Sequence, residues 1–406
     1  MMDVQSCVLM KFGEIVLKGR NRVLFYAQLR RNVQRLLQDL GPLELRQRGG
    51  VLAVLSPGPV EGLVERARNV LGVNLLHPAL VLEKTPESAC AAAVDLLRDR
   101  EGVTFAVRAR RRDKGWRLTS HELATIVGRA VQDELGLAVD LSNPDLEVHL
   151  EVDKQELFAF SERIPGRGGL PVGVSGRAMC LISGGIDSPV AGYRAMKRGL
   201  RCDFVHFSGR PFTGPESIYK AYAQAARLDA FQGGSRLFVV PFGSVQRQLA
   251  TAGAARLQVI AQRRLMMRTA SALAEREGAE ALVTGDSLGQ VSSQTLRNLS
   301  VVEDAARLPV LRPLVAWDKS EIVREAQDIG TYEIANLPAE DCCTLFASPL
   351  AETRAAPDQI VRLEQRLDID ETVAQLVGAA ELVRPRRESQ PVQPVLQTHY
   401  AGNMDS

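Results

Sequence analysis

One segment carries the clearest chemistry in the sequence: residues 181–191 read LISGGIDSPVA and directly follow the apolar run 178–180. This pattern predicts a strand that ends in a glycine-rich turn, with a helix starting near Pro189. Two adjacent glycines leave backbone N–H groups uncovered and a helix start adds partial positive charge, so the turn forms a nest for phosphate. A tight turn that binds nothing is the alternative, but Asp187 and Ser188 extend the pattern beyond a bare Gly-Gly pair.

Two common phosphate motifs do not fit this turn. A P-loop needs a lysine after its last glycine, and a dinucleotide fingerprint needs Gly-x-Gly-x-x-Gly; residues 183–188 read Ser-Gly-Gly-Ile-Asp-Ser instead. This pattern resembles the pyrophosphate loop of enzymes that split ATP into AMP and pyrophosphate. We therefore predict ATP as a substrate.

The elements around this turn alternate between strand and helix from residue 176 to 340, which predicts an α/β fold with a doubly wound parallel sheet. The strands are expected at four apolar runs: 178–182, 204–207, 237–242 and 281–283. Ligands in such sheets bind at the carboxyl ends of the strands, where the strand order reverses. Four segments follow the predicted strands and should converge on one crevice: 183–188, 206–207, 242–243 and 284–286.

Length and composition bound the class of protein. The 406 residues suffice for two or three domains, and a net charge of +2 means that any nucleic-acid surface must be local. No run of about 18 apolar residues occurs, so we expect neither a signal peptide nor a membrane span. The six cysteines lack paired spacing, which favours a reducing cytoplasm.

Two basic stretches precede the predicted ATP domain. Residues 11–22 place Lys18, Arg20 and Arg22 beside two glycines, a pattern that suits an anionic backbone or a solvated loop. Residues 108–117 hold six cations and one tryptophan, a pattern that suits phosphate contact with one stacking platform, or a solvated charged face. Its cations are Arg108, Arg110, Arg111, Arg112, Lys114 and Arg117.

Over the whole chain, the motifs resemble the bacterial tRNA 4-thiouridine synthetase family, from about residue 5 to about residue 345. The stretches that carry the resemblance are 11–22, 105–129, 168–173, 183–191, 206–213, 284–296, 309–314, 318–322 and 329–332. The resemblance implies ferredoxin-like and THUMP domains, both α+β, followed by a pyrophosphate-loop domain of the adenine nucleotide alpha hydrolase type. We assign them to 1–57, 58–165 and 176–383, with a linker at 166–175 and a polar tail at 384–406.

The resemblance also implies a reaction. Members activate the C4 oxygen of uridine 8 in tRNA with ATP, and persulfide sulfur then replaces AMP to give 4-thiouridine. Asp187 is the carboxylate of the loop, expected to organise Mg²⁺ or the reacting phosphate. The implied ATP contacts are Leu181, Ile182, Ser183, Gly184, Gly185, Ser188, His206, Phe207, Arg263, Gly285 and Gln294, with Arg264 as a rival to Arg263. The basic residues of both stretches named above become tRNA-contact candidates.

Cys342 and Cys343 match the segment where the family keeps a reactive cysteine, and Cys342 aligns better. Cys342 would carry the persulfide or resolve one; a buried pair of inert thiols is the alternative. Some members add a C-terminal rhodanese domain with a second reactive cysteine, but no cysteine follows Cys343 here. We therefore expect a short form that receives sulfur from a cysteine desulfurase or a separate carrier. The family's second role, which is sulfur delivery to ThiS for thiamine thiazole synthesis, is doubtful for such a short form. The resemblance also implies a homodimer.

Two other functions stand as alternatives to this one. Another pyrophosphate-loop ligase would not need the cations at 108–117, and a catalytically silent tRNA-binding protein would not need the intact 183–188 loop.

Overall fold

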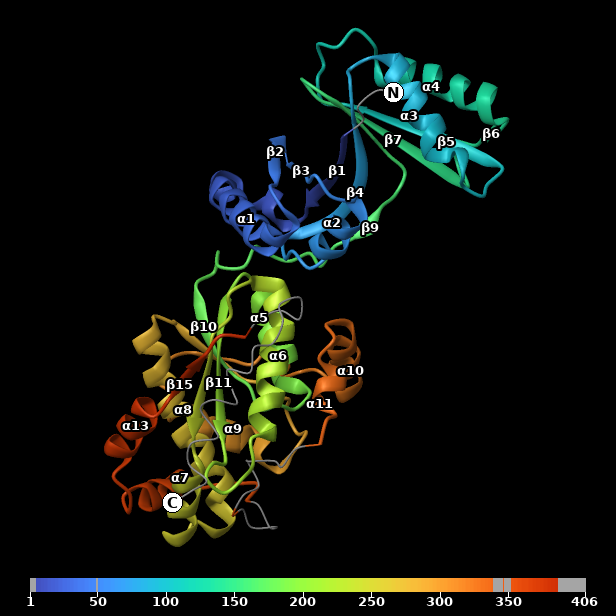
Figure 1. Ribbon diagram of the computed structural model, residues 1–406. Coiled ribbons are helices and arrows are strands. Elements are labelled where there is room, and N and C mark those ends of the chain that lie inside the picture. The colour runs from blue at the N-terminus through green and yellow to red at the C-terminus, as the bar shows by residue number, and fades with distance from the viewer. Residues whose placement is uncertain (1–4, 49, 339–345, 347–351, 386–406) are drawn as a thin grey trace. The chain divides into compact units, whose positions relative to one another are not determined.

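The computed structural model describes residues 5–48, 50–338, 346 and 352–385 (Figure 1). The chain divides into two compact units, Met1–Pro171 and Val172–Ser406, and the division falls inside the predicted linker. Across the described residues, no helix has the length and hydropathy needed to cross a bilayer.

The first unit is built on one sheet with strand order β2-β3-β1-β4-β8-β7-β5-β6, and β9 pairs with β4. Strand β4 (Val73–Leu82) is shared by both halves, because it pairs with β1 (Gln5–Phe12) along its length and with β8 (Leu157–Phe160) near its end. The remaining elements are η1 (Glu14–Leu17), η2 (Gly19–Asn21), α1 (Arg22–Leu36), η3 (Gln38–Leu40), β2 (Glu44–Arg48), β3 (Val51–Leu55), α2 (Val60–Ala67), α3 (Pro86–Arg98), β5 (Thr104–Arg111), α4 (Ser120–Leu135), β6 (Ala138–Val139), β7 (Leu146–Val152) and β9 (Ile164–Pro165).

The first core extends further along the chain than the sequence suggested. Leu63 and Val64 of α2 pack in one cluster with Leu29 and Val33 of α1, although the predicted domain boundary lay at residue 57. The reason is that α2 contacts β1 and the start of β4, which complete the same layer. A separate cluster holds α3, α4 and the strands β5, β7 and β8.

The second unit contains a six-stranded sheet of order β14-β13-β10-β11-β12-β15, parallel except for β15. The chain runs from β10 outward to β12, then returns to the other side of β10 with β13, so the strand order reverses between β10 and β13. Its elements are β10 (Arg177–Leu181), α5 (Asp187–Lys197), β11 (Arg201–Ser208), α6 (Glu216–Gln232), β12 (Leu237–Pro241), α7 (Gly243–Thr251), η4 (Ala255–Leu257), α8 (Gln258–Glu277), β13 (Ala281–Val283), η5 (Ser292–Gln294), α9 (Leu296–Glu303), β14 (Val310–Leu311), α10 (Lys319–Asp328), α11 (Tyr332–Ala335), α12 (Pro357–Glu364), α13 (Ile369–Gly378) and β15 (Glu381–Val383).

Helices cover both faces of this sheet, which confirms the doubly wound prediction (Figure 1). Alternate residues of β10 point to opposite faces. Met179 joins the cluster that contains α7, α8 and α9, whereas Cys180 lies beside Gly192 of α5. A Cβ at Gly192 would lie 3.4 Å from Phe204, so α5 packs closely onto the sheet there.

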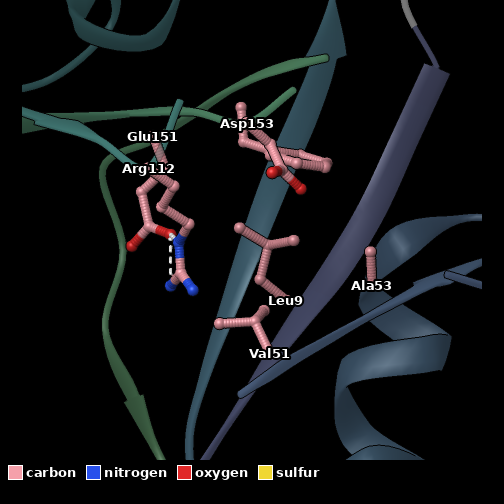
Figure 2. A pocket seen from close by; sticks show the side chains of 7 residues that line it. Leu9, Val51, Ala53, Arg112, Glu151 and Asp153 are labelled. Carbon is pink, nitrogen blue, oxygen red and sulfur yellow. Dashed lines mark hydrogen bonds and ion pairs between the residues drawn. The ribbon is translucent and has the colours of Figure 1, made fainter. Parts of the chain in front are cut away.

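A buried carboxylate links the two halves of the first unit. Glu151 on β7 is only 7% exposed at its side chain and pairs with Lys11 of β1 at 2.6 Å and Arg112 at 3.0 Å. Figure 2 shows Arg112 and Glu151 joined beside Leu9 and Val51 in a pocket with room for about one water (about 10 Å³). Burial raises the pKa of Glu151, but Lys11 and Arg112 outweigh it, so the pKa of this carboxyl lies below its ordinary value.

Replacing Glu151 by glutamine should lower the free energy of unfolding of the first unit by roughly 3 kcal/mol, because Lys11 and Arg112 lose their buried partner. Because the pKa of Glu151 is lower in the folded protein, its carboxylate stabilises the fold at pH values above its unfolded pKa of about 4.3. This contribution to stability is lost as the pH falls through the folded-state pKa. Glu151→Gln should therefore show a shallower loss of stability in acid. Denaturant titrations at several pH values measure this, with exposed Glu134→Gln as control; equal stability of both variants would contradict the assignment.

Candidate active site

The glycine-rich loop runs from the end of β10 to the start of α5 and is ordered by its own serines. The Ser183 backbone N–H donates to Ser188 Oγ (3.1 Å), and the Gly185 N–H donates to Ser183 Oγ (3.3 Å). Gly184 has φ of +85°, a conformation that favours glycine. The buried Gln224 side-chain amide donates to the carbonyls of Gly184 and Gly185 (3.0 Å each), which fixes the loop from behind.

A cavity of about 280 Å³ opens at the point where the strand order reverses. A Cβ at Gly285, just after β13, would lie 2.7 Å from the Ser188 nitrogen, so this close approach requires glycine. Nine of the predicted site residues line this cavity: Leu181, Ile182, Ser183, Asp187, Ser188, Phe207, Arg263, Gly285 and Gln294. Gly184, Gly185 and His206 do not line it.

Asp187 has two partners that the sequence did not suggest. Its carboxylate accepts from Lys319 Nζ at 2.6 Å and from Gln290 Nε2 at 3.0 Å. Lys319 is the first residue of α10, and its side chain is 47% exposed. An ammonium held against the loop carboxylate beside the cavity can neutralise phosphate charge. The only sequence signal for Lys319 was its place in the matching stretch 318–322.

A second carboxylate, Asp286, organises the opposite wall. It accepts from Arg263 at 2.5 Å and Thr284 Oγ1 at 2.8 Å, and Arg312 lies 3.3 Å away. Burial raises the pKa of Asp286, but Arg263, Thr284 and Arg312 outweigh it and hold this pKa below its usual range. The Gln294 amide also reaches Asp286, at 3.4 Å. Asp286 therefore positions two of the predicted ATP contacts.

The adjacent arginines of α8 have different surroundings. Arg263 lines the cavity, whereas Arg264 is 3% exposed and pairs with Glu364 at 2.7 Å and Asp304 at 3.1 Å. Of the two residues, Arg263 is therefore the one that can contact a ligand in the cavity. Arg264 instead connects α8 to α12 through its ion pair with Glu364.

His206 is buried behind the loop. Nδ1 lies 2.9 Å from the Ile182 carbonyl and Nε2 lies 3.2 Å from Ser217 Oγ. Burial lowers the pKa of His206 to about 4, so the ring is neutral at neutral pH. A neutral ring that donates from Nδ1 supports the Ile182 backbone, and His206 does not line the cavity where the sequence predicted an ATP contact.

The basic stretches of the first unit divide into two groups. Arg108 and Arg112 pair with Glu147 and Glu151, and Arg111 donates to two backbone carbonyls of the loop that follows β5. The other candidates are exposed or half-buried, and among the described residues no carboxylate pairs with them: Lys18, Arg20, Arg22, Arg110, Lys114 and Arg117. Lys18 lies over the Phe25 ring. Cys342 and Cys343 lie outside the described residues.

A magnesium ion fits this site only as a partner of bound phosphates. No cluster of three potential ligands occurs among the residues that the structure describes. Asp187 lines the cavity at the start of α5, directly after the glycine-rich loop. Mg²⁺ bound to nucleotides commonly uses one or two carboxylates and several waters.

A glycine-rich loop at the switch point of a doubly wound sheet, with two cation-paired carboxylates around its cavity, defines a pyrophosphate-loop enzyme. Family models match in chain order: the ThiI ferredoxin-like domain at 7–76, the THUMP domain at 85–160 and the thiamine biosynthesis protein ThiI at 173–369. The chain belongs to the ThiI family of tRNA sulfurtransferases.

The relatives cover nearly the whole chain. A probable tRNA sulfurtransferase of Nocardia farcinica is 52% identical over 94% of each chain, and one of Moorella thermoacetica is 40% identical over 95% of this chain and 100% of its own. The crystal structure of a 4-thiouridine synthetase–RNA complex with bound ATP matches with a TM-score of 0.87 and 31% identity, covering 94% of this chain and 100% of that one.

The two arginines of α8 should respond differently to substitution. Arg263→Gln should weaken ATP binding roughly tenfold or more, because a hydrogen bond to a charged group contributes about 1.5–3 kcal/mol. Its loss of stability should be smaller than that of Arg264→Gln, because Asp286 keeps Arg312 and Thr284 as partners. Arg264→Gln should cost about 3 kcal/mol of stability, because it leaves Glu364 buried without its main partner. Calorimetric ATP titration and thermal unfolding of both variants test this; ATP binding lost at unchanged stability in Arg264→Gln would reverse the assignment.

Proposed function

We propose that this protein uses ATP to adenylate uridine 8 of tRNA and then replaces the activated oxygen with sulfur, giving 4-thiouridine. The observation that carries this proposal is the cavity between the glycine-rich loop and Gly285, in a chain that belongs to the tRNA sulfurtransferases. The similar solved structure binds both RNA and ATP.

The C4 oxygen of uridine is amide-like and is a poor leaving group, so the first step must activate it. Its attack on the α-phosphorus of ATP forms an adenylate and releases pyrophosphate, which divides one hard displacement into two easier ones. The loop amides with Ser183 and Ser188 bind the phosphates, while Lys319 and Arg263 neutralise the pyrophosphate charge. Mg²⁺, held by Asp187 and the phosphates, would add further neutralisation.

In the second step the terminal sulfur of a persulfide attacks C4 and displaces AMP, which leaves the base joined to the protein by a disulfide. A second thiol then attacks that S–S bond, which releases 4-thiouridine and forms a protein disulfide that an external thiol reduces. Cys342 is our candidate for carrying or resolving that persulfide, and a cysteine desulfurase is the proposed donor. We propose a homodimer and a cytoplasmic location; the four cysteines among the described residues are free, which suits a reducing compartment. The name of the matching family model favours a second role in thiamine synthesis through ThiS.

The proposed tRNA surface of the first unit uses the cations without carboxylate partners. RNA helices are recognised by shape and backbone, for which exposed cations suffice. Arg110, Lys114 and Arg117 are exposed and follow one another from the end of β5 into the next loop.

The triple variant Arg110→Gln/Lys114→Gln/Arg117→Gln should bind tRNA more weakly and with a salt dependence shallower by about 0.9 for each phosphate that is no longer neutralised. Stability should not change, because these side chains are exposed. Filter binding over a salt series measures the slope, with Arg98→Gln on α3 as the matched control. An unchanged slope would remove these residues from the tRNA surface.

The activity itself is tested with tRNA, labelled ATP and either sulfide or a desulfurase with cysteine. We expect pyrophosphate release and near-UV absorbance from 4-thiouridine. Asp187→Ala should abolish adenylation, and Cys342→Ala should keep adenylation but stop desulfurase-dependent sulfur transfer. Absence of both products with the unaltered protein would refute the function, and full desulfurase-driven activity of Cys342→Ala would refute the role of that cysteine.

A further inference from the structure

A second hollow is lined by residues that directly follow those of the ATP cavity in the chain. Val291, Ser293 and Gln294 line the cavity, and the residues that follow them line an open groove of about 580 Å³. The groove is lined by Thr295, Leu296, Arg297, Ser300, Thr353 and Arg354. We call it the Arg297 groove. Because the chain passes directly from Gln294 in the cavity to Thr295 in the groove, a ligand in the groove would lie next to the cavity.

The walls of the groove are joined by a buried side chain. Asn298 is fully buried; its amide donates to the carbonyls of Ser292 (2.9 Å) and Glu352 (2.8 Å), and its oxygen accepts from the Ala355 N–H (3.0 Å). Thr295 Oγ1 donates to the Thr353 carbonyl at 2.8 Å. These bonds fix the two walls against each other, so the groove is preorganised.

The groove is cationic and partly apolar. Arg297 and Arg354 are exposed, and no carboxylate among the described residues pairs with either guanidinium. Arg263, Arg264 and Arg312, which lie nearby in the same unit, all pair with carboxylates. Leu296 lines the groove with 73% of its surface exposed, and Thr295, Ser300 and Thr353 of the lining carry hydroxyl groups.

We propose that the Arg297 groove holds the single strand of tRNA that flanks the target uridine, an inference that rests on the proposed function. An enzyme that modifies a base must take it out of its stack, and the strand beside it then needs support. Proteins that hold single strands combine cations for the phosphates with flat or apolar side chains for a base. Arg297 and Arg354 supply the cations, and Leu296 supplies the apolar contact.

A protein partner, such as the sulfur donor, is the competing occupant. The groove suits RNA better because its two guanidiniums and its hydroxyls match phosphate and ribose oxygens. The acceptor base must also enter the adjacent cavity, whereas a docking protein needs only one reactive sulfur there.

The test compares the unaltered full chain with the double variant Arg297→Gln/Arg354→Gln. With saturating ATP and free sulfide, kcat/KM for tRNA should fall about tenfold, and its salt dependence should become shallower by about 0.7 for each single-strand phosphate that is no longer neutralised. KM for ATP and the melting temperature should stay unchanged. Arg297→Lys/Arg354→Lys should restore most of the activity, and Arg307→Gln, exposed outside the groove, should behave as the unaltered protein.

The sulfur source separates the two occupants. An equal loss with sulfide and with a desulfurase supports a tRNA strand, whereas a loss seen only with the desulfurase would assign the groove to a protein and overturn the proposal. An unchanged kcat/KM, or a raised KM for ATP with lowered stability, would also overturn it. If the unaltered protein makes no 4-thiouridine from either source, the proposed function fails and the groove assignment fails with it.

Discussion

The close approach of two backbone segments at the switch point of the parallel sheet is the constraint on which the nucleotide cavity depends. β10 and β13 are neighbours in the sheet but are far apart in sequence, so the loops that follow them meet only after the sheet has formed. The missing side chain at Gly285 lets the second loop reach the Ser188 nitrogen. Any Cβ there would push the loops apart and open the phosphate nest.

The same approach brings two carboxylates to one cavity that must accept a polyanion. Each carboxylate is matched by cations: Lys319 pairs with Asp187, and Arg263 and Arg312 pair with Asp286. The third cation, Arg312, also pairs with Glu303 at 2.5 Å, so the charge of both carboxylates is balanced before ATP arrives. The carboxylates therefore do not repel the phosphates; they hold flexible cationic side chains in place, which lowers the entropy that binding must still remove.

The local part of the site could be predicted from sequence, and the long-range part could not. The loop at 183–188 is a contiguous pattern, and the strands around it are apolar runs, so loop and sheet were both predicted. The partners of Asp187 lie 103 and 132 residues away, and no local pattern links Gln290 or Lys319 to the loop. The predicted boundary at residue 57 separates α2 from the first core for a similar reason. The helix α2 packs into that core together with β4, which comes later in the chain.

The arginines show most clearly why the sequence alone does not predict which cations can bind RNA. All the arginines at 108–117 look alike in the sequence, yet Arg112 has given up part of its hydration to bind Glu151, while Arg110 remains in water. Moving Arg112 to a phosphate would cost its ion pair with the buried Glu151. Arg263 differs because it lines the cavity itself, and Arg312 still pairs with Asp286 when Arg263 meets a phosphate. An exposed guanidinium without a carboxylate partner breaks no ion pair when it binds a phosphate. Its binding also releases the counterions condensed on the nucleic acid. The same distinction separates Arg264 from Arg297 in the second unit, so the position of the carboxylates decides which cations build the fold and which remain available to RNA.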